Sequence, residues 1–348
     1  MSYWVIPSLA LIMALVLLLP FSIKRVEEEL EIFLLVMGCA AMTLSGLWNR
    51  HIVKESFVEP INISIAVLVA GFMFRAGRNK IENAIERLEK NIGLNHSLFA
   101  LIVFLGFLSS LITAIVAALI LCEVISHLRL DRPSRIRTAV YACYAIGMGA
   151  ALTPLGEPLS TIVTAKLQGP PHNAGFFWLA NLLFLWVTPA IVAVAALAAY
   201  WRPLGRETST SSVSDKVPDT NKAVFMRAGK VYIFVVALVY LGEGVKPIAN
   251  KLLSALEGWQ FYWLGLTSAA LDNATLAAAG IVPSMGRAQI LSFVLSLLIS
   301  GGILIPGNIP NIISAAKLGV KSREWARAAI PAGVALLVTY FLALAVIY

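Results

Sequence analysis

Charged residues are scarce in this chain: Asp, Glu, Lys and Arg make up 13% of its 348 residues, whereas 59% are hydrophobic. A soluble domain carries about 25% charged residues, so this chain has too little polar surface to cover a water-soluble particle. The mean hydropathy of +0.83 agrees with that shortage. The composition excludes an ordinary soluble protein and predicts an integral membrane protein.

Cysteine and histidine are scarce as well. The three cysteines are Cys39, Cys122 and Cys143, and the four histidines are His51, His96, His127 and His172. All three cysteines lie inside apolar blocks and form no CxxC pair, which argues against a disulfide framework. The histidines fall at predicted loop ends, so neither a Ser-His hydrolase nor a zinc protease is expected.

Apolar blocks of about 20 residues, separated by short basic loops, make up most of the chain. They predict membrane-spanning helices, because barrel strands would alternate over about ten residues. The clear spans are 3–22, 30–48, 58–77, 176–201, 230–248 and 326–347. The first block has no basic segment before it and is expected to be retained. The net charge of +8 then reflects basic loops and not a nucleic-acid partner.

Two further apolar regions, 96–165 and 260–320, are interrupted by Gly, Pro, Ser and Asn, and they resemble each other. GFLSSLITAIVAA matches GLTSAALDNATLAAA, which sets Ser109 against Ser268 at an offset of 159. TPLGEPLSTIVTAKL matches IPGNIPNIISAAKL, which sets Lys166 against Lys317 at an offset of 151. Two matches in the same order predict that the chain contains two repeated halves.

The domain organisation follows from these matches. We predict an extra N-terminal helix pair (1–48), a first repeat (58–201), a cytoplasmic linker (202–226) and a second repeat (227–348). Each repeat is expected to contain a re-entrant hairpin and a broken span, at about 96–128 and 133–167 in the first, and about 260–285 and 288–318 in the second. Residues 80–92 and 246–257 are expected to form helices in the membrane interface.

The predicted topology is inverted between the halves. A re-entrant hairpin enters and leaves on one side, so the first repeat crosses the membrane three times and the second begins on the opposite side. With both termini outside, 21 of the 27 Lys and Arg residues lie on the cytoplasmic side, as the positive-inside rule requires. The predicted fold class is an all-α polytopic membrane protein with an inverted-topology repeat, two re-entrant helical hairpins and two broken transmembrane helices.

The broken segments form the candidate site. Non-helical backbone at membrane depth needs hydrogen-bond partners, and paired breaks in inverted halves indicate a midplane ion site. The candidate cation- and proton-binding residues are Ser109, Ser110, Thr113, Thr153, Glu157, Ser160, Ser268, Asp272, Asn273, Thr275, Asn308 and Asn311, and the candidate carbonyls are those of Pro154, Gly156, Pro306 and Gly307. Hard oxygen ligands suit Na⁺ better than a transition metal. The alternative for the Ser and Thr residues is close helix packing.

Two carboxylates carry the most weight, because an ionisable group inside the membrane is costly and is normally functional. They are Asp272 and Glu157, and the alternative role of Glu157 is to cap the following half-helix. Glu123 lies near the end of its apolar run and is expected at the interface. Lys166 and Lys317 are expected to extend toward opposite surfaces, and we do not assign them to the site.

Three runs, LDNATLAAAG, TPLGEPLSTIV and GGILIPGNIPN, resemble the ion-transporter superfamily of secondary transporters. The resemblance covers about residues 58–348. It is strongest to NhaD-type sodium/proton antiporters and to a prokaryotic family of proposed cation transporters. The resemblance implies a homodimer in the prokaryotic cytoplasmic membrane, with a scaffold and a mobile, elevator-type transport domain that contains both hairpins. PGNIPN also resembles the loops of sodium-coupled dicarboxylate carriers. The tips SSLIT and LDNAT differ from the Ser-Asn-Thr tips of those carriers, which argues against an organic anion.

The function that we expect is non-enzymatic: secondary active transport of a monovalent cation, with Na⁺/H⁺ antiport favoured. Loss of water around a midplane carboxylate disfavours its ionised form, whereas bound Na⁺ favours it. H⁺ and Na⁺ then compete for one group, and no cofactor beyond these transported ions is expected.

Three alternatives stay open. A Na⁺-coupled symporter of a small carboxylate or other anion would use half-helix N-termini, although two carboxylates oppose a bound anion. A channel would need a continuous pore. An intramembrane aspartyl protease would need a second Asp that faces Asp272.

Overall fold

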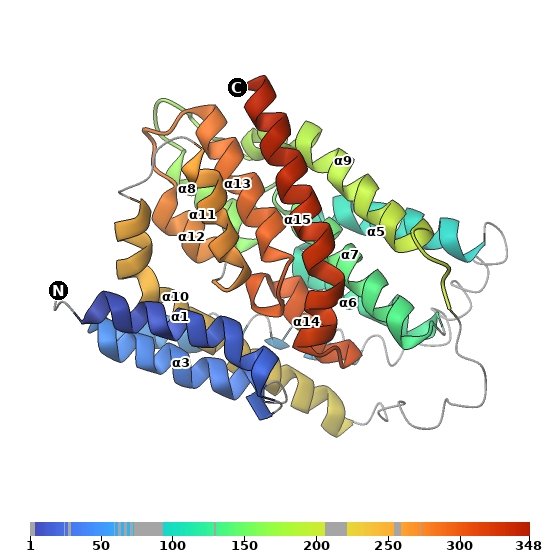
Figure 1. The fold of residues 1–348 in the computed structure, drawn as a ribbon, viewed down its shortest axis with the longest axis horizontal. Coiled ribbons are helices and arrows are strands. Elements are labelled where there is room, and N and C mark those ends of the chain that lie inside the picture. Colours follow the sequence, from blue (N-terminus) through green and yellow to red (C-terminus); the bar gives the residue numbers. More distant parts are fainter. Residues whose placement is uncertain are drawn as a thin grey trace.

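The computed structural model describes residues 4–23, 25–26, 29–58, 60–61, 64–65, 68–69, 72, 93–128, 130–205, 221–253, 259–271 and 273–348. This part of the chain is all-helical and contains no strand, which confirms the predicted all-α class (Figure 1). Its first helices are α1 (Val5–Ser22), α3 (Leu30–Ser45), α5 (Leu94–Ile112), α6 (Ala114–His127), α7 (Arg132–Ala150), α8 (Pro158–Lys166) and α9 (Trp178–Tyr200). After the linker come α10 (Asn221–Leu253), α11 (Gln260–Leu264), η1 (Gly265–Ala269), α12 (Asn273–Gly280), α13 (Arg287–Gly301), η2 (Ile305–Gly307), α14 (Ile309–Leu318) and α15 (Ser322–Ile347).

Four helical segments in the described part are long and apolar enough to cross a membrane. They are Leu94–Ile112, Trp178–Tyr200, Ala228–Ile248 and Ser322–Ile347. The shorter helices α1, α3, α6 and α13 are also apolar. An all-helical fold with these segments is that of a helical membrane protein. The predicted span 58–77 and the predicted interfacial helix 80–92 lie largely or wholly outside the described residues.

Helix α10 is longer than the predicted span 230–248. It begins at Asn221, inside the range predicted as linker, and continues through Pro247 to Leu253, inside the predicted interfacial helix 246–257. The first six residues of α10 contain no Gly or Pro, so the helix extends into them without a break. Residues 206–220 of the predicted linker lie outside the described residues.

The N-terminal helices α1 and α3 lie alongside α10 and form one side of the molecule (Figure 1). Gly244 permits the close contact, because a Cβ there would lie 2.6 Å from Cβ of Ala41. Small residues at such contacts allow helices to associate in lipid, where no hydrophobic driving force acts between them. One ion pair joins the same helices, Lys230 to Glu31 at 2.6 Å.

The remaining helices pack around α7, which contacts α5, α6, α9, α13, α14 and α15. Buried aromatic side chains fix α15 against this group by hydrogen bonds to backbone carbonyls. Tyr144 of α7 donates to the Ala329 carbonyl at 3.1 Å, and Tyr262 of α11 donates to the Leu337 carbonyl at 2.7 Å. Such bonds satisfy polar groups that would otherwise be buried without a partner. The two interrupted helices, α7–α8 and α13–α14, therefore lie at the centre of the fold.

Candidate functional site

Two helices stop and restart inside the protein. The first break, residues 151–157, separates α7 from α8, and the second break, residues 302–308, separates α13 from α14. The residues that precede the restarted helices, Glu157 and Asn308, are both buried and extended, with φ of −157° and −155°. Each restarted helix has a proline in its first turn, where no backbone N–H is needed. The two breaks thus share one local form.

In each break a side chain from the restarted helix donates to a backbone carbonyl of the break. Ser160 Oγ donates to the carbonyl of Thr153 at 2.7 Å. Asn311 Nδ2 donates to the carbonyl of Leu304 at 2.9 Å and also to that of Gly301 at 2.8 Å. The two donors, Ser160 and Asn311, are 151 positions apart, and so are the two acceptors, Thr153 and Leu304. The Gly301 carbonyl is the last of α13 and has no partner within that helix, so Asn311 satisfies a group that the helix leaves open.

The breaks also bring backbone segments into direct contact. A Cβ at Gly156 would lie 1.9 Å from the carbonyl oxygen of Ala150, and one at Gly307 would lie 2.5 Å from that of Gly301. Neither position has room for a side chain. The offset of 151 relates these contacts as well.

The last part of each interrupted helix, just before its break, accepts a hydrogen bond from a serine of an earlier helical segment. Ser109 of α5 donates to the Ile146 carbonyl of α7 at 3.0 Å, and Ser268 of η1 donates to the Leu297 carbonyl of α13 at 3.3 Å. The serines are related by the offset of 159 and the carbonyls by 151. The serines matched in sequence therefore make matched contacts in space.

The first tip, residues 109–114 at the junction of α5 and α6, contacts the first break. Thr153 Oγ1 donates to the Ser110 carbonyl at 2.5 Å, and the Ala114 N–H donates to the Gly156 carbonyl at 2.8 Å. Thr113 has φ of +75°, which is strained for a β-branched residue and costs about 1–3 kcal/mol. Strain of this kind clusters at functional sites, so the first tip is a structural feature worth testing for function.

The second tip, residues 268–273, lies on the second break, but two of its candidates are not described. Asp272 lies outside the described residues, and so does the side chain of Thr275. Asn273 is buried, and a Cβ at Gly301 would lie 3.6 Å from its Nδ2. Asn273 therefore faces the end of α13.

Residues from both halves meet at the second break. A Cβ at Gly147 of α7 would lie 2.6 Å from Nδ2 of Asn308, so this amide packs against the first interrupted helix. Cys143 of α7 donates to the Pro310 carbonyl at 3.5 Å. The predicted site residues of the second half are thus in contact with the first half near its own break.

Buried polar atoms remain at the second break after these bonds are formed. Asn311 is 0% exposed, and because its Nδ2 serves two carbonyls, its Oδ1 faces the other way. Among the described residues Oδ1 has no hydrogen-bond partner, and neither have Ser300 Oγ and Asn273 Nδ2. Burying a polar atom without a partner is unfavourable, so such atoms indicate a bound ion, a water or a functional role.

The first break places a carboxylate at the start of α8. Glu157 is buried, and its side chain makes no capping hydrogen bond to α8, which disfavours the capping role. The positive end of the helix favours a negative charge at this position. Two candidate carbonyls of this break already accept one bond each, that of Pro154 from Thr161 at 2.5 Å and that of Gly156 from Ala114. No hydrogen bond to the carbonyls of Pro306 and Gly307 is observed among the described residues.

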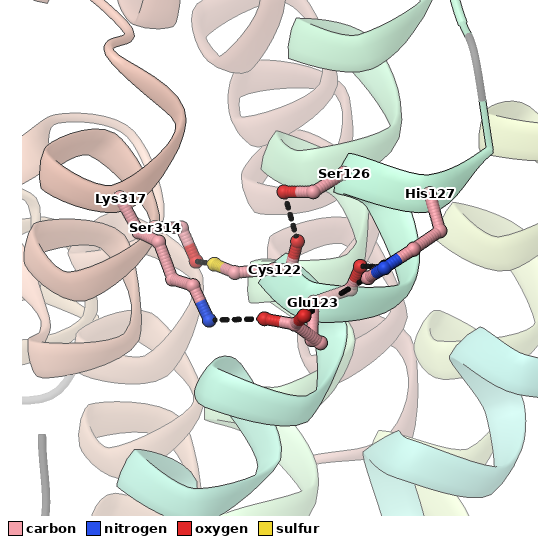
Figure 2. Close-up of polar contacts among 6 residues, drawn as sticks. All are labelled: Cys122, Glu123, Ser126, His127, Ser314 and Lys317. Atoms are coloured by element: carbon pink, nitrogen blue, oxygen red, sulfur yellow. Dashed lines mark hydrogen bonds and ion pairs between the residues drawn. The ribbon is translucent and has the colours of Figure 1, made fainter. Parts of the chain in front are cut away.

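Sequence reasoning missed a buried charge cluster. Glu123 is not freely exposed: its side chain is 12% exposed and accepts a hydrogen bond from Lys317 of α14 at 2.8 Å (Figure 2). His127 lies 3.8 Å from the same carboxylate. Lys166 does not extend freely to a surface either, because its Nζ donates to the carbonyls of Ala278 and Ile281. The one sequence signal for these contacts was that Lys166 and Lys317 occupy matched positions in the two halves.

The fold and site together define an all-helical, membrane-type protein with two buried, oxygen-rich helix breaks. The chain belongs to the family described as "Protein of unknown function (DUF1646)", whose model matches residues 6–347. No curated protein matches the chain. Within the described part of the chain, no group of three or more His, Cys, Asp or Glu residues could hold a metal ion. The breaks offer hydroxyl, amide and carbonyl oxygens together with the carboxylate of Glu157.

We expect Asn311→Ala to lower the free energy of unfolding by about 1–3 kcal/mol, because it removes the side-chain donor to the buried Gly301 carbonyl and one of the two donors to the Leu304 carbonyl. Thermal unfolding of the purified protein in detergent, followed by circular dichroism, measures the change. The matched control is Asn181→Ala, which removes an exposed amide from α9 and should leave the midpoint unchanged. Equal midpoints for the two variants would mean that Asn311 does not hold the break.

Proposed function

We propose that this protein is a secondary active transporter of a monovalent cation, and that Na⁺/H⁺ antiport is its activity. The observation that carries the proposal is Asn311, a buried amide whose nitrogen is fully engaged and whose oxygen is left facing the protein interior at a helix break. Such an oxygen suits a hard cation. A partly dehydrated Na⁺ gains ligands there, and the amide oxygen gains a partner.

The proposed architecture is an inverted repeat, with each helix break in the membrane interior. It is supported by the paired contacts of Ser109 with Ile146 and of Ser268 with Leu297, and by the matched bonds of Ser160 and Asn311. It is also supported by the bias of Lys and Arg toward one side. Paired breaks in inverted halves are the arrangement in which secondary transporters bind substrates at the midplane.

Coupling in this proposal resides at Asp272. Its neighbours in the chain, Leu271 and Asn273, are both buried, and Asn273 faces the second break. Loss of water disfavours a bare carboxylate, so the group binds either H⁺ or Na⁺. If only the neutralised carrier crosses, exchange of the two ions follows. Glu157 is a second acid in this proposal, and it lies at the N-terminus of α8 in the first break.

The moving unit in this proposal contains both tips and both interrupted helices. The contacts of α6 with α14 and of α8 with α12 join the halves within that unit. A homodimer in a prokaryotic cytoplasmic membrane, with both termini outside, would supply a fixed scaffold for an elevator-type movement. The transported ions are Na⁺ and H⁺, and the surrounding lipid is the other partner.

One observation favours a second candidate, a Na⁺-coupled symporter of a small carboxylate or other anion. Asn273 Nδ2 is a buried donor without a partner among the described residues, and a donor cannot bind a cation. Two acids at the site oppose a bound anion. Uptake of labelled Na⁺ that depends on an added carboxylate would favour the symporter.

The topology is tested with single cysteines at Ser211 and Arg287, placed in a variant in which the three native cysteines are alanine. We expect the two positions to react with a membrane-impermeant maleimide from opposite sides of oriented vesicles, because the inverted repeat places them on opposite faces. Gel shift after labelling reports the modified fraction. Labelling of both from one side would contradict the inverted repeat.

We expect Asp272→Asn to abolish Na⁺-dependent proton flux in proteoliposomes, because it removes the titratable proton and the ionic ligand while keeping the size of the side chain. Dequenching of a ΔpH-sensitive dye, measured with Na⁺, Li⁺ and K⁺ in turn, reports the flux. Asp219→Asn in the linker is the matched control and should retain it. Wild-type flux in a folded Asp272→Asn protein would place coupling elsewhere, and absence of flux from the wild type with every cation would contradict antiport.

A further inference from the structure

Two lysines at matched positions join the two halves of the protein. Lys166 ends α8 and Lys317 lies near the end of α14, and the offset of 151 relates them. Each lysine reaches a helix of the opposite half. Lys166 binds backbone carbonyls at the end of α12. Lys317 binds Glu123 on α6, as Figure 2 shows. The restarted helix of each break is therefore held by a helix from the other half.

The acceptors of the two lysines differ in chemistry. Lys166 donates to the backbone carbonyls of Ala278 and Ile281, the latter at 3.1 Å, and carbonyls do not titrate. Lys317 donates to the Glu123 carboxylate at 2.8 Å, and the two side chains are 14% and 12% exposed. A carboxylate loses its negative charge when it binds a proton, and a partly buried pair then loses most of its attraction. Only one of the two contacts is sensitive to protons.

Charged and titratable groups surround Glu123 from several helices. Lys317 of α14 and His127 of α6 lie next to its carboxylate. Groups on the other neighbouring helices have partners of their own. His96 of α5 packs edge-on against Tyr200, and Lys230 of α10 pairs with Glu31. On α7, Arg132 pairs with Glu324, Arg137 donates to the Arg202 and Pro203 carbonyls, and Tyr144 donates to the Ala329 carbonyl. Protonation of Glu123 would therefore remove the negative charge that Lys317 faces here, and His127 supplies none in its place.

The Glu123–Lys317 pair lies at the contact between α6, α7 and α14, which we call the seam. Next to it, Cys122 of α6 donates to Ser314 Oγ of α14 at 3.4 Å (Figure 2). Cys143 of α7 donates to the same oxygen at 3.1 Å. Both thiols are buried. Ser314 and Lys317 follow Asn311 on the same helix, so the position of α14 against α6 also fixes the position of Asn311.

We infer that Glu123 and Lys317 are a positioning pair for the second break, which holds α14 and its Asn311 oxygen in place only while Glu123 is ionised. Lys166 is the proton-insensitive counterpart in the other half. The inference deepens the proposed antiport, because it gives protons on the α6–α14 side a direct effect on cation binding. Its structural part, the opening of the α6–α14 seam, does not depend on transport.

The thiol of Cys122 lies in the seam and can report its opening. With Cys39→Ala and Cys143→Ala, Cys122 is the one remaining thiol, and its reaction with 4,4′-dithiodipyridine measures opening of the seam. Rates are divided by that of free cysteine at the same pH. We expect slow reaction at about pH 8 and a rise of about tenfold at about pH 5, where carboxylates begin to protonate. Glu123→Gln and Lys317→Met should react fast at both pH values.

Three further variants separate positioning from general damage to the fold. Lys317→Arg keeps the charge pair and should react slowly at pH 8, as should the exchanged pair Glu123→Lys with Lys317→Glu. Lys166→Met, the matched control, should leave the Cys122 rate at its wild-type value. Slow, pH-independent reaction in Glu123→Gln and Lys317→Met would overturn the inference, and so would an equal increase in Lys166→Met.

A transport measurement completes the test. In proteoliposomes, Glu123→Gln should raise the Na⁺ concentration for half-maximal exchange, leave the maximal rate unchanged and remove the pH dependence of that concentration. An unchanged pH profile would overturn the inference. If no variant, including the wild type, exchanges Na⁺, the proposed function fails while the thiol rates still decide whether the pair holds the seam.

Discussion

The structure depends on one constraint: a helix that stops in a buried interior must have its last carbonyls satisfied by other groups of the protein. Asn311 meets this requirement for the last carbonyl of α13, Ser160 binds a carbonyl inside the first break, and Ser109 and Ser268 add bonds from earlier segments. Each of these side chains ties one element to another. The breaks are therefore rigid, and the elements around them are held in a defined arrangement.

The same constraint concentrates oxygen atoms where a small cation could bind. Carbonyls and side chains gather at the breaks because the backbone needs them, and the second break retains the Asn311 oxygen without a partner among the described residues. Contacts between the halves then determine how these oxygens are placed. Asn308 packs on α7, and Lys317 binds α6 through a pair that depends on ionisation. In our proposal, ion binding and the joining of the two halves are therefore parts of one arrangement.

The sequence predicted the helical class and the positions of the interrupted helices, because Gly, Pro and Asn inside an apolar run are local signals. The match of Ser109 with Ser268 was also local, and the two serines make matched contacts. The contact of Glu123 with Lys317 was not predictable, because it joins residues 194 positions apart and follows from how α6 meets α14. The orientation of the Asn311 amide was not predictable either, since it depends on the Gly301 and Leu304 carbonyls, which come together only in the folded break. The extension of α10 beyond its predicted span shows that an apolar window does not define helix ends.

The central claim is that the breaks bind a hard cation in preference to organic cations. Thermal unfolding of the purified protein in Na⁺ and in choline, at equal ionic strength, tests it most directly. A ligand at about 100 times its Kd stabilises the folded state by about 2.7 kcal/mol, so the unfolding midpoint should rise with Na⁺ concentration and saturate. The rise should be lost in Asp272→Asn. The same midpoint in Na⁺ and choline across all concentrations would contradict the account.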